Sequence, residues 1–161
     1  MKDLHSALAS LTTGIYVLTT SDGRERHGMS ASWATQVSGD PALLAIAVGR
    51  GHRSGALLEA SGVCALNVVG AATRHLEDYF FSPASQKPDN LASIAHSLHA
   101  SGAPVLDEVA TALICRVQQR HDAGDHILFI AAVEDVVVRE PDRPLTSLDL
   151  DYVYVGTVVR R

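Results

Sequence analysis

Residues 49–55 (GRGHRSG) form a glycine-rich turn that follows an apolar run and precedes a helical pattern. Backbone N–H groups at the start of a helix bind anions, so the amides of Arg53 and Ser54, together with the Arg53 guanidinium, could bind a phosphate. The turn is not a dinucleotide fingerprint, because its third glycine is one position late for G-x-G-x-x-G and no acidic residue ends the next strand. The alternative is a solvated loop that carries a surface arginine.

Residues 28–38 (GMSASWATQVS) are mostly small or hydroxylated. Small side chains let a flat ligand approach the backbone, and hydroxyl and amide groups can bond the polar edge of a heteroaromatic ring or a sugar chain. The sole tryptophan, Trp33, could stack on such a ligand. Two alternatives stay open: a Ser/Thr-rich strand on a sheet surface, and a Trp33 that belongs to the core or to an interface.

The triplet Gly124-Asp125-His126 lies at the tip of a predicted hairpin. A histidine at the mouth of a strand can donate a hydrogen bond, accept a proton or bind an anionic ligand, and its charge responds to its neighbours near neutral pH. The alternative is a solvent-exposed histidine without a role.

The other reactive residues give little support to metal binding or hydrolysis. The eight histidines are scattered, and no Glu or Cys lies at zinc-ligand spacing beside the closest pairs, so we predict no metal site. No G-x-S-x-G motif occurs, which argues against a hydrolase. The acidic residues expected on solvated helix or turn faces are Glu77, Asp78, Asp107 and Glu108.

Composition favours one folded domain over residues 1–161, because 47% of the residues are hydrophobic and 19% charged. The formal net charge of −5 argues against general nucleic-acid binding. No apolar stretch approaches the roughly 20 residues that cross a bilayer, and the N-terminus lacks a secretory pattern, so we expect a cytoplasmic protein. Cys64 and Cys115 lie in apolar runs and are expected to be small buried hydrophobes.

Short apolar and β-branched runs between turn signals dominate the chain. They predict strands at residues 14–20, 43–48, 63–69, 109–119, 126–138 and 152–156, a short helix at 53–60 and a polar, helical connection at 71–100. The alternation in 109–119 predicts a half-exposed strand that pairs antiparallel with 126–138. About six strands with few helices predict a mainly β barrel with short peripheral helices, because closing the sheet removes exposed edges.

In order and spacing, these pieces resemble the flavin reductase-like family, the short-chain FMN-binding split-barrel proteins. The resemblance covers most of residues 10–135. No single piece is specific for the family, but their order and spacing together are. Its parts are 13–20 (TGIYVLTT) with 22–23 (DG), 27–38 (HGMSASWATQVS), Pro41, 61–68 (SGVCALNV), 102–106 (GAPVL), Cys115 and 124–126 (GDH). The chain departs from the family pattern at residues 39–41 (GDP), and at His52, where lysine or asparagine is common.

The resemblance implies a homodimer of FMN-binding split β-barrels that act as NAD(P)H:flavin oxidoreductases. NADH or NADPH would be the electron donor and FMN or FAD the acceptor, and the reduced flavin would serve a partner monooxygenase. The same resemblance implies three groups of flavin-binding residues. They are Ser30, Ala31, Ser32 and Trp33 along the ribityl chain and ring; Gln36, Val37 and Ser38 on the isoalloxazine or phosphate side; and His52, Arg53 and Ser54 at the phosphate.

In the family the Gly-Asp-His motif is tied to nicotinamide binding, so the resemblance implies that His126 lies beside the face at which hydride arrives and positions the nicotinamide. Two other classes of protein stay open. One is a flavoprotein that retains FMN and takes electrons from a protein partner. The other is a β-barrel dimer without flavin that has only an interaction role.

Overall fold

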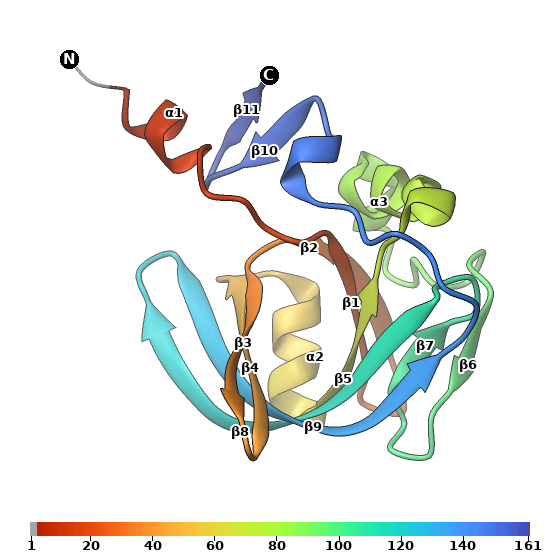
Figure 1. Cartoon of the computed structure of the whole chain (residues 1–161). Helices are drawn as coiled ribbons and strands as arrows, with labels where there is room; N and C mark the ends of the chain where they lie inside the picture. The colour runs from red at the N-terminus through yellow and green to blue at the C-terminus, as the bar shows by residue number, and fades with distance from the viewer. Residues whose placement is uncertain (1–2) are drawn as a thin grey trace.

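The computed structural model describes residues 3–161, and its main feature is a seven-stranded antiparallel sheet (Figure 1). The order of the strands is β2-β1-β5-β8-β9-β4-β3. They are β1 (Tyr16–Ser21), β2 (Arg26–Ala31), β3 (Ala34–Gly39), β4 (Ala42–Gly49), β5 (Val63–Val68), β8 (Thr111–Ala123) and β9 (His126–Val138). The two edge strands, β2 and β3, are joined in the chain by Ser32 and Trp33 alone. The sheet must therefore curl until its edges approach each other, which makes an open barrel.

Besides the barrel strands, residues 3–161 form three short helices and two small sheets. The helices are α1 (Leu4–Leu8), α2 (Arg53–Ser61) and α3 (Arg74–Phe81), with 3-10 turns at Ala71–Thr73, Pro83–Gln86 and Ser147–Asp149. β6 (His96–Leu98) pairs with β7 (Pro104–Leu106), and β10 (Tyr152–Tyr154) pairs with β11 (Val158–Arg160). The β10–β11 hairpin lies above one end of the barrel, next to α3 (Figure 1). The predicted mainly β barrel with short peripheral helices is confirmed.

The number of strands differs from the expected six or so, because residues 3–161 contain eleven. The strands missed by sequence reasoning are β2, β3, β6, β7 and β11, which have three to six residues each. They are short and rich in polar or small residues, so they carry little of the apolar periodicity that marks a strand.

The expectation of a half-exposed strand at 109–119 is wrong for the first half of β8. Ala112 and Ile114 are fully buried on one face, and Cys115 is fully buried on the other. Both faces are covered because α3, β7 and the segment around Leu145 pack on the outside of the barrel. Beyond residue 117, β8 is exposed.

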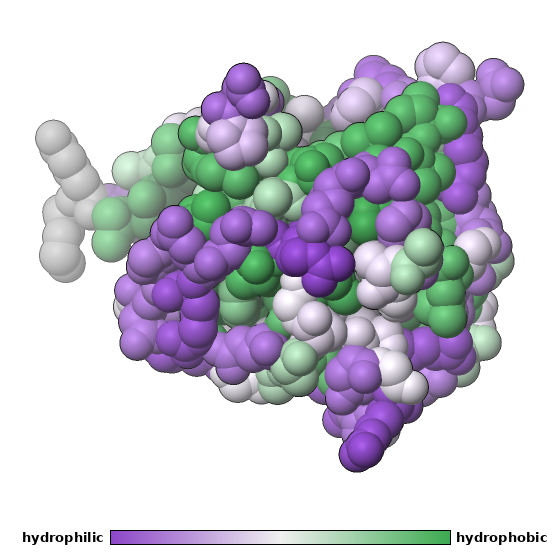
Figure 2. Space-filling model, turned by 90° about the horizontal axis from the view of Figure 1, so that it is seen from below, coloured by the Kyte–Doolittle hydropathy of each residue, from purple (hydrophilic) through white to green (hydrophobic). Residues whose placement is uncertain are grey.

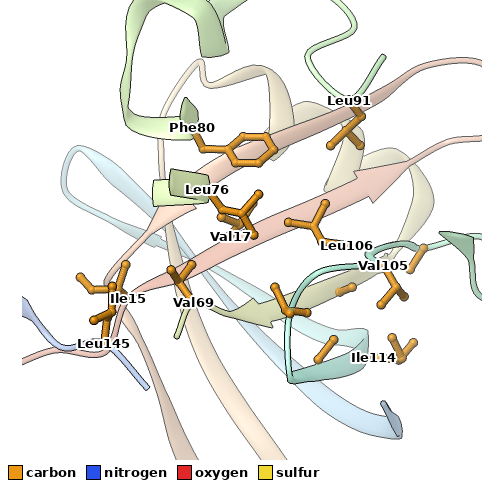
Figure 3. Packing of buried hydrophobic residues seen from close by; sticks show 14 of the residues in the cluster. Ile15, Val17, Val69, Leu76, Phe80, Leu91, Val105, Leu106, Ile114 and Leu145 are labelled. Atoms are coloured by element: carbon orange, nitrogen blue, oxygen red, sulfur yellow. The ribbon is translucent and has the colours of Figure 1, made fainter. Parts of the chain in front are cut away.

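Two apolar clusters cover the two faces of the sheet. Neighbouring residues of β1 point to opposite faces, so Val17 belongs to the outer cluster and Leu18 to the inner one. Figure 3 shows Leu76 and Phe80 of α3 in the outer cluster, close to Val17. Leu58 of α2 packs in the inner cluster. The helices therefore seal faces that the strands alone would expose.

Cys64 and Cys115 are direct cross-strand partners in β5 and β8, and both are fully buried free thiols. Their prediction as small buried hydrophobes is confirmed.

Within residues 3–161, no helix is both long and apolar enough to cross a membrane. On the face opposite the β10–β11 hairpin, apolar areas (green) lie between hydrophilic ones (purple) in Figure 2.

Candidate functional site

A cleft of about 310 Å³ lies at the end of β2, beside the link from β2 to β3. Its wall is built by the end of β2 and the link to β3, by β4, by α3 and by the C-terminal segment that ends in β10. Six of the residues predicted to bind flavin or nicotinamide line it: Ser30, Ala31, Ser32, Trp33, His52 and His126. The fold therefore brings together residues from three separate stretches of the sequence.

Small side chains form one wall of the cleft. Ser30 and Ala31 end β2, and Ala47 and Gly49 lie on the neighbouring wall contributed by β4. A wall of this kind lets a planar ligand lie close to the backbone. The alternative interpretation was a Ser/Thr-rich strand on a sheet surface. It does not describe Ser30, because Ser30 lines this cleft.

Aromatic rings form another part of the cleft. The centroid of the Trp33 ring lies 4.5 Å from that of His126 and 5.3 Å from that of Tyr154. His126 is only 7% exposed, so the alternative of a solvent-exposed histidine is wrong. The three rings can offer both π-faces and a ring nitrogen to a ligand.

Two polar neighbours hold His126 in place. Its Nδ1 lies 2.7 Å from the Oδ1 atom of Asp125, and this hydrogen bond lowers the pKa of the Asp125 carboxyl. Arg50 braces the same turn, since its Nε donates to the carbonyl of Gly124 at 2.7 Å and its backbone N–H donates to the carbonyl of Asp125 at 3.0 Å. With Nδ1–H bound to Asp125, the Nε2 atom of the neutral ring is an acceptor.

His52 caps the N-terminus of α2. Its Nδ1 accepts a hydrogen bond of 3.2 Å from the backbone N–H of Ser54, so the neutral ring carries its proton on Nε2. Burial lowers the pKa of His52, which keeps the ring neutral at pH 7. His52 therefore offers a neutral N–H donor to the cleft.

The other two residues of the predicted phosphate seat do not line the cleft. The guanidinium of Arg53 pairs with the carboxylate of Glu25 at 2.5 Å, on a different surface. Ser54 is fully buried, and its Oγ lies 2.9 Å from Nδ1 of His27. Of the predicted seat, only His52 reaches the cleft.

Residues 36–38 lie further along β3, outside the cleft lining. Gln36 and Val37 are exposed, Ser38 is half-buried, and the Gln36 side chain donates to the backbone carbonyl of Ser38 at 3.2 Å. A register shift between Gln36 and Ser38 in the pairing with β4 turns this part of the strand away from a regular ladder. The structure thus does not bring these residues to the other predicted flavin ligands.

The expectation that Glu77 lies on a solvated helix or turn face is wrong. Its side chain is 2% exposed and lines the cleft. It accepts hydrogen bonds from the Ser30 hydroxyl at 2.7 Å and from the Tyr152 hydroxyl at 2.8 Å. Burial raises the pKa of the Glu77 carboxyl, while these two bonds oppose the rise. Asp78, Asp107 and Glu108 are exposed, as expected.

Close packing of α3 on β2 places Glu77 at the cleft. Gly28 makes this approach possible, because a Cβ there would lie 2.5 Å from the Phe80 ring. The Asn90 side chain then fixes the strand, since it accepts from the Gly28 N–H at 2.8 Å and donates to the Gly28 carbonyl at 2.7 Å. Ser30, two residues on, is thereby held on the side that faces α3.

Because the pKa of Glu77 is raised in the folded protein, we expect Glu77 to affect how the free energy of unfolding depends on pH. The carboxyl ionises at a lower pH in the unfolded chain than in the folded one, so its ionised form opposes folding at neutral pH. Glu77→Gln should therefore be more stable than the wild type at pH 8, and this advantage should shrink as the pH falls through the raised pKa toward 4.5. Urea unfolding at several pH values measures the effect.

The matched control is Glu140→Gln, which makes the same change at an exposed glutamate and should alter stability little at any of these pH values. The charged neighbours of Glu77 are Asp78, which raises its pKa, and Arg74, which lowers it. An advantage of Glu77→Gln that stayed constant from pH 4.5 to pH 8 would show that ionised Glu77 does not oppose folding.

Sequence reasoning missed Tyr152, Tyr154 and Thr13, which also line the cleft. Alternation along the predicted last strand could have placed both tyrosines on one face. No local pattern marks Thr13, whose Oγ1 is buried and has no hydrogen-bond partner within the described residues. Residues 3–161 also contain no group of three or more His, Cys, Asp or Glu side chains placed to hold a metal ion.

The family of the chain follows from comparison with known proteins. Residues 8–156 match the model of the flavin reductase like domain, and the chain belongs to this family. It is 26% identical to the FMN reductase (NADH) RutF of Agrobacterium fabrum over 93% of this chain and 86% of the relative. The chain also matches a diflavin flavoprotein of Nostoc sp. with 32% identity over 81% of its length, but it spans only 23% of that relative.

Solved structures agree with this assignment. The NADH:FAD oxidoreductase SgcE6 of Streptomyces globisporus has a TM-score of 0.80 at 26% identity, over 89% of this chain and 85% of that one. The nitrilotriacetate monooxygenase component B homologue of Mycobacterium thermoresistibile has a TM-score of 0.78 at 26% identity, over 87% and 78%. The predicted family and the predicted class of enzyme, NAD(P)H:flavin oxidoreductase, are confirmed.

Proposed function

We propose that this chain transfers hydride from NADH or NADPH to FMN or FAD in the cleft at the end of β2 and releases the reduced flavin to a partner monooxygenase. The observation that carries the proposal is the approach of His126 to Trp33, 4.5 Å between ring centroids, beside a wall of small residues in a member of this family. The SgcE6 relative is described with NAD and FAD fragments, and another relative is a monooxygenase component.

The cleft suits the ring and the ribityl chain of a flavin. The small residues Ser30, Ala31 and Ser32 leave room beside the backbone, and the buried Oγ1 of Thr13 lacks a partner within the described residues. A bound flavin supplies a ring that accepts hydride from the nicotinamide. The protein binds and orients both partners, so no catalytic acid is required.

The phosphate of the flavin is assigned to His52 at the N-terminus of α2. In this assignment Nε2–H of His52 donates to the phosphate, and the positive end of the α2 dipole begins at the next residue. No Lys or Arg lines the cleft among residues 3–161. The phosphate is therefore held by a neutral donor and a helix terminus, which favours a flavin that is released over one that is retained.

His126 is assigned to the nicotinamide. Its Nε2 is an acceptor, and its ring lies against Trp33, so it can contact the carboxamide N–H₂ while Trp33 keeps the ring face in place. Asp125 and Arg50 hold the turn that carries His126 and thus fix the direction of Nε2.

Homodimer formation and a cytoplasmic location belong to the same proposal. Support for a second copy comes from large apolar side chains left exposed on the chain, among them Leu4, Leu11, Val136, Val138 and Leu148. Sedimentation of the purified protein at several concentrations measures the state of association, and a monomer at all of them would contradict the dimer.

Flavin titration followed by reduction tests the function. Purified protein should be nearly colourless after desalting, quench the fluorescence of added FMN or FAD, and bleach that flavin when NADH or NADPH is added. A yellow protein whose flavin survives desalting and ignores both nicotinamides would support an electron carrier. Failure to quench either flavin would exclude both interpretations.

A further inference from the structure

Glu77 is a buried carboxyl that the proposed hydride transfer does not use. It lies on α3 and is held by hydroxyl groups from two other elements, Ser30 of β2 and Tyr152 of β10. The ring of Phe81, one helical turn further on, stacks on Tyr152 with 4.5 Å between centroids and 19° between planes. The C-terminal hairpin is thus attached to α3 at the wall of the cleft, by one polar and one apolar contact.

The directions of the hydrogen bonds around Glu77 leave mainly acceptor sites for a ligand in this part of the cleft. An ionised carboxylate has about four acceptor sites, and Ser30 and Tyr152 use two of them. Because both hydroxyls donate their proton to Glu77, only their lone pairs remain for a ligand. Carboxylate and hydroxyls therefore all favour a ligand that donates hydrogen bonds.

The charges of the cleft are arranged asymmetrically. Glu77 is the one carboxylate that lines the cleft in the described part of the chain, while the side of His52 carries an N–H donor and a helix N-terminus. The two sides are also reached from opposite faces of β2. His27 lies beside His52, with 5.9 Å between ring centroids, and Ser30 binds Glu77. These two residues are three positions apart in the strand, so their side chains point to opposite faces.

We propose that Glu77 is a specificity-determining residue that binds hydrogen-bond donors of the flavin, its ribityl hydroxyls or its imide N–H, and keeps the phosphate at the His52 side. This inference rests on the proposed function. A phosphate beside Glu77 would meet a like charge in a poorly solvated site, whereas hydroxyl or N–H donors would satisfy its free acceptor sites. The orientation of the ligand is thereby set by the two sides of the cleft together.

Binding of riboflavin and FMN to matched variants tests the inference. Both molecules contain the ring and the ribityl chain, and only FMN has the phosphate. Glu77→Gln should raise the Kd of both by about tenfold and by the same factor, because a charged acceptor is lost. His52→Ala should raise the Kd of FMN alone. Asp78→Asn, which removes an exposed charge from the same helix, should change neither.

Lumiflavin, which lacks the ribityl chain, separates the two kinds of donor. If Glu77→Gln weakens lumiflavin binding as much as riboflavin binding, the imide N–H is the donor. If only riboflavin is affected, the ribityl hydroxyls are. Tyr152→Phe, which keeps the Glu77 charge and the stacking on Phe81, should weaken riboflavin and FMN equally, by a smaller factor than Glu77→Gln.

Unchanged riboflavin binding by Glu77→Gln, or an effect on FMN alone, would overturn the inference. Circular dichroism and thermal unfolding of each variant establish that it folds. If Glu77→Gln does not fold, the binding measurements with Tyr152→Phe test the inference in its place. If the wild-type protein binds none of the three flavins, the proposed function itself fails. If it binds them and Glu77→Gln binds them equally well, only the role of Glu77 is lost.

Discussion

Replacing His126 with alanine should raise the KM for NADH by about tenfold or more, while the Kd for FMN changes by less than about twofold. The reason is the position of the ring. His126 contacts Trp33 from the first residue of β9, and its Nε2 is the acceptor left over once Nδ1 binds Asp125. Steady-state kinetics with NADH and fluorescence titration with FMN measure the two quantities separately.

Two further variants make this result specific. His121→Ala removes an exposed histidine from the same hairpin and should leave both quantities unchanged. His126→Phe retains a ring against Trp33 but no ring nitrogen, so its KM should stay high if the hydrogen bond matters. Unaltered stopped-flow reduction of flavin by His126→Ala at every NADH concentration would remove His126 from nicotinamide binding.

Replacing Asn67 with alanine should lower the free energy of unfolding by about 3–5 kcal/mol. Asn67 is fully buried in β5. Its amide donates to the Val17 carbonyl and to the Thr19 hydroxyl, each at 2.9 Å, and its Oδ1 accepts from the Leu106 N–H at 3.0 Å. The substitution removes all three of these buried hydrogen bonds to β1 and β7, and urea unfolding measures the cost.

The control for Asn67 is Gln118→Ala, which removes an exposed amide from β8. It should change stability by less than about 0.5 kcal/mol. Unfolding curves of Asn67→Ala and Gln118→Ala that coincide would show that the Asn67 network does not stabilise the connection between β1, β5 and β7.

Local sequence was sufficient for the long strands and for the family. β4 and β9 are largely apolar runs, β8 begins with an alternating pattern, and Gly124 reaches its φ of +61° at the predicted turn between β8 and β9. The motifs at residues 28–38 and 124–126 were recognisable because small residues and a turn histidine are unusual next to apolar strands. The residues alone left the roles of Trp33 and His126 open, and only the resemblance to the family implied that both contribute to one site.

Which side chains enter that site was decided by tertiary packing. Arg53 follows His52 directly, yet its guanidinium pairs with Glu25 while the His52 ring faces the cleft. Glu77 reads as a solvated helix residue, and it is buried only because α3 packs on β2 at Gly28 and Tyr152 arrives from the end of the chain. Neither outcome has a signal within its own stretch of sequence.

The sequence by itself determined the class of fold, the family and the stretches that contribute the site, because strand periodicity, turns and motif spacing are properties of neighbouring residues. Only the tertiary structure decided that Glu77, Tyr152 and Tyr154 join Ser30, Trp33 and His126, and that Gln36 and Arg53 do not. Burial and hydrogen bonding of a polar side chain depend on partners far away in the sequence, as in the bond between Tyr152 and Glu77, which are 75 residues apart. No local pattern encodes those partners.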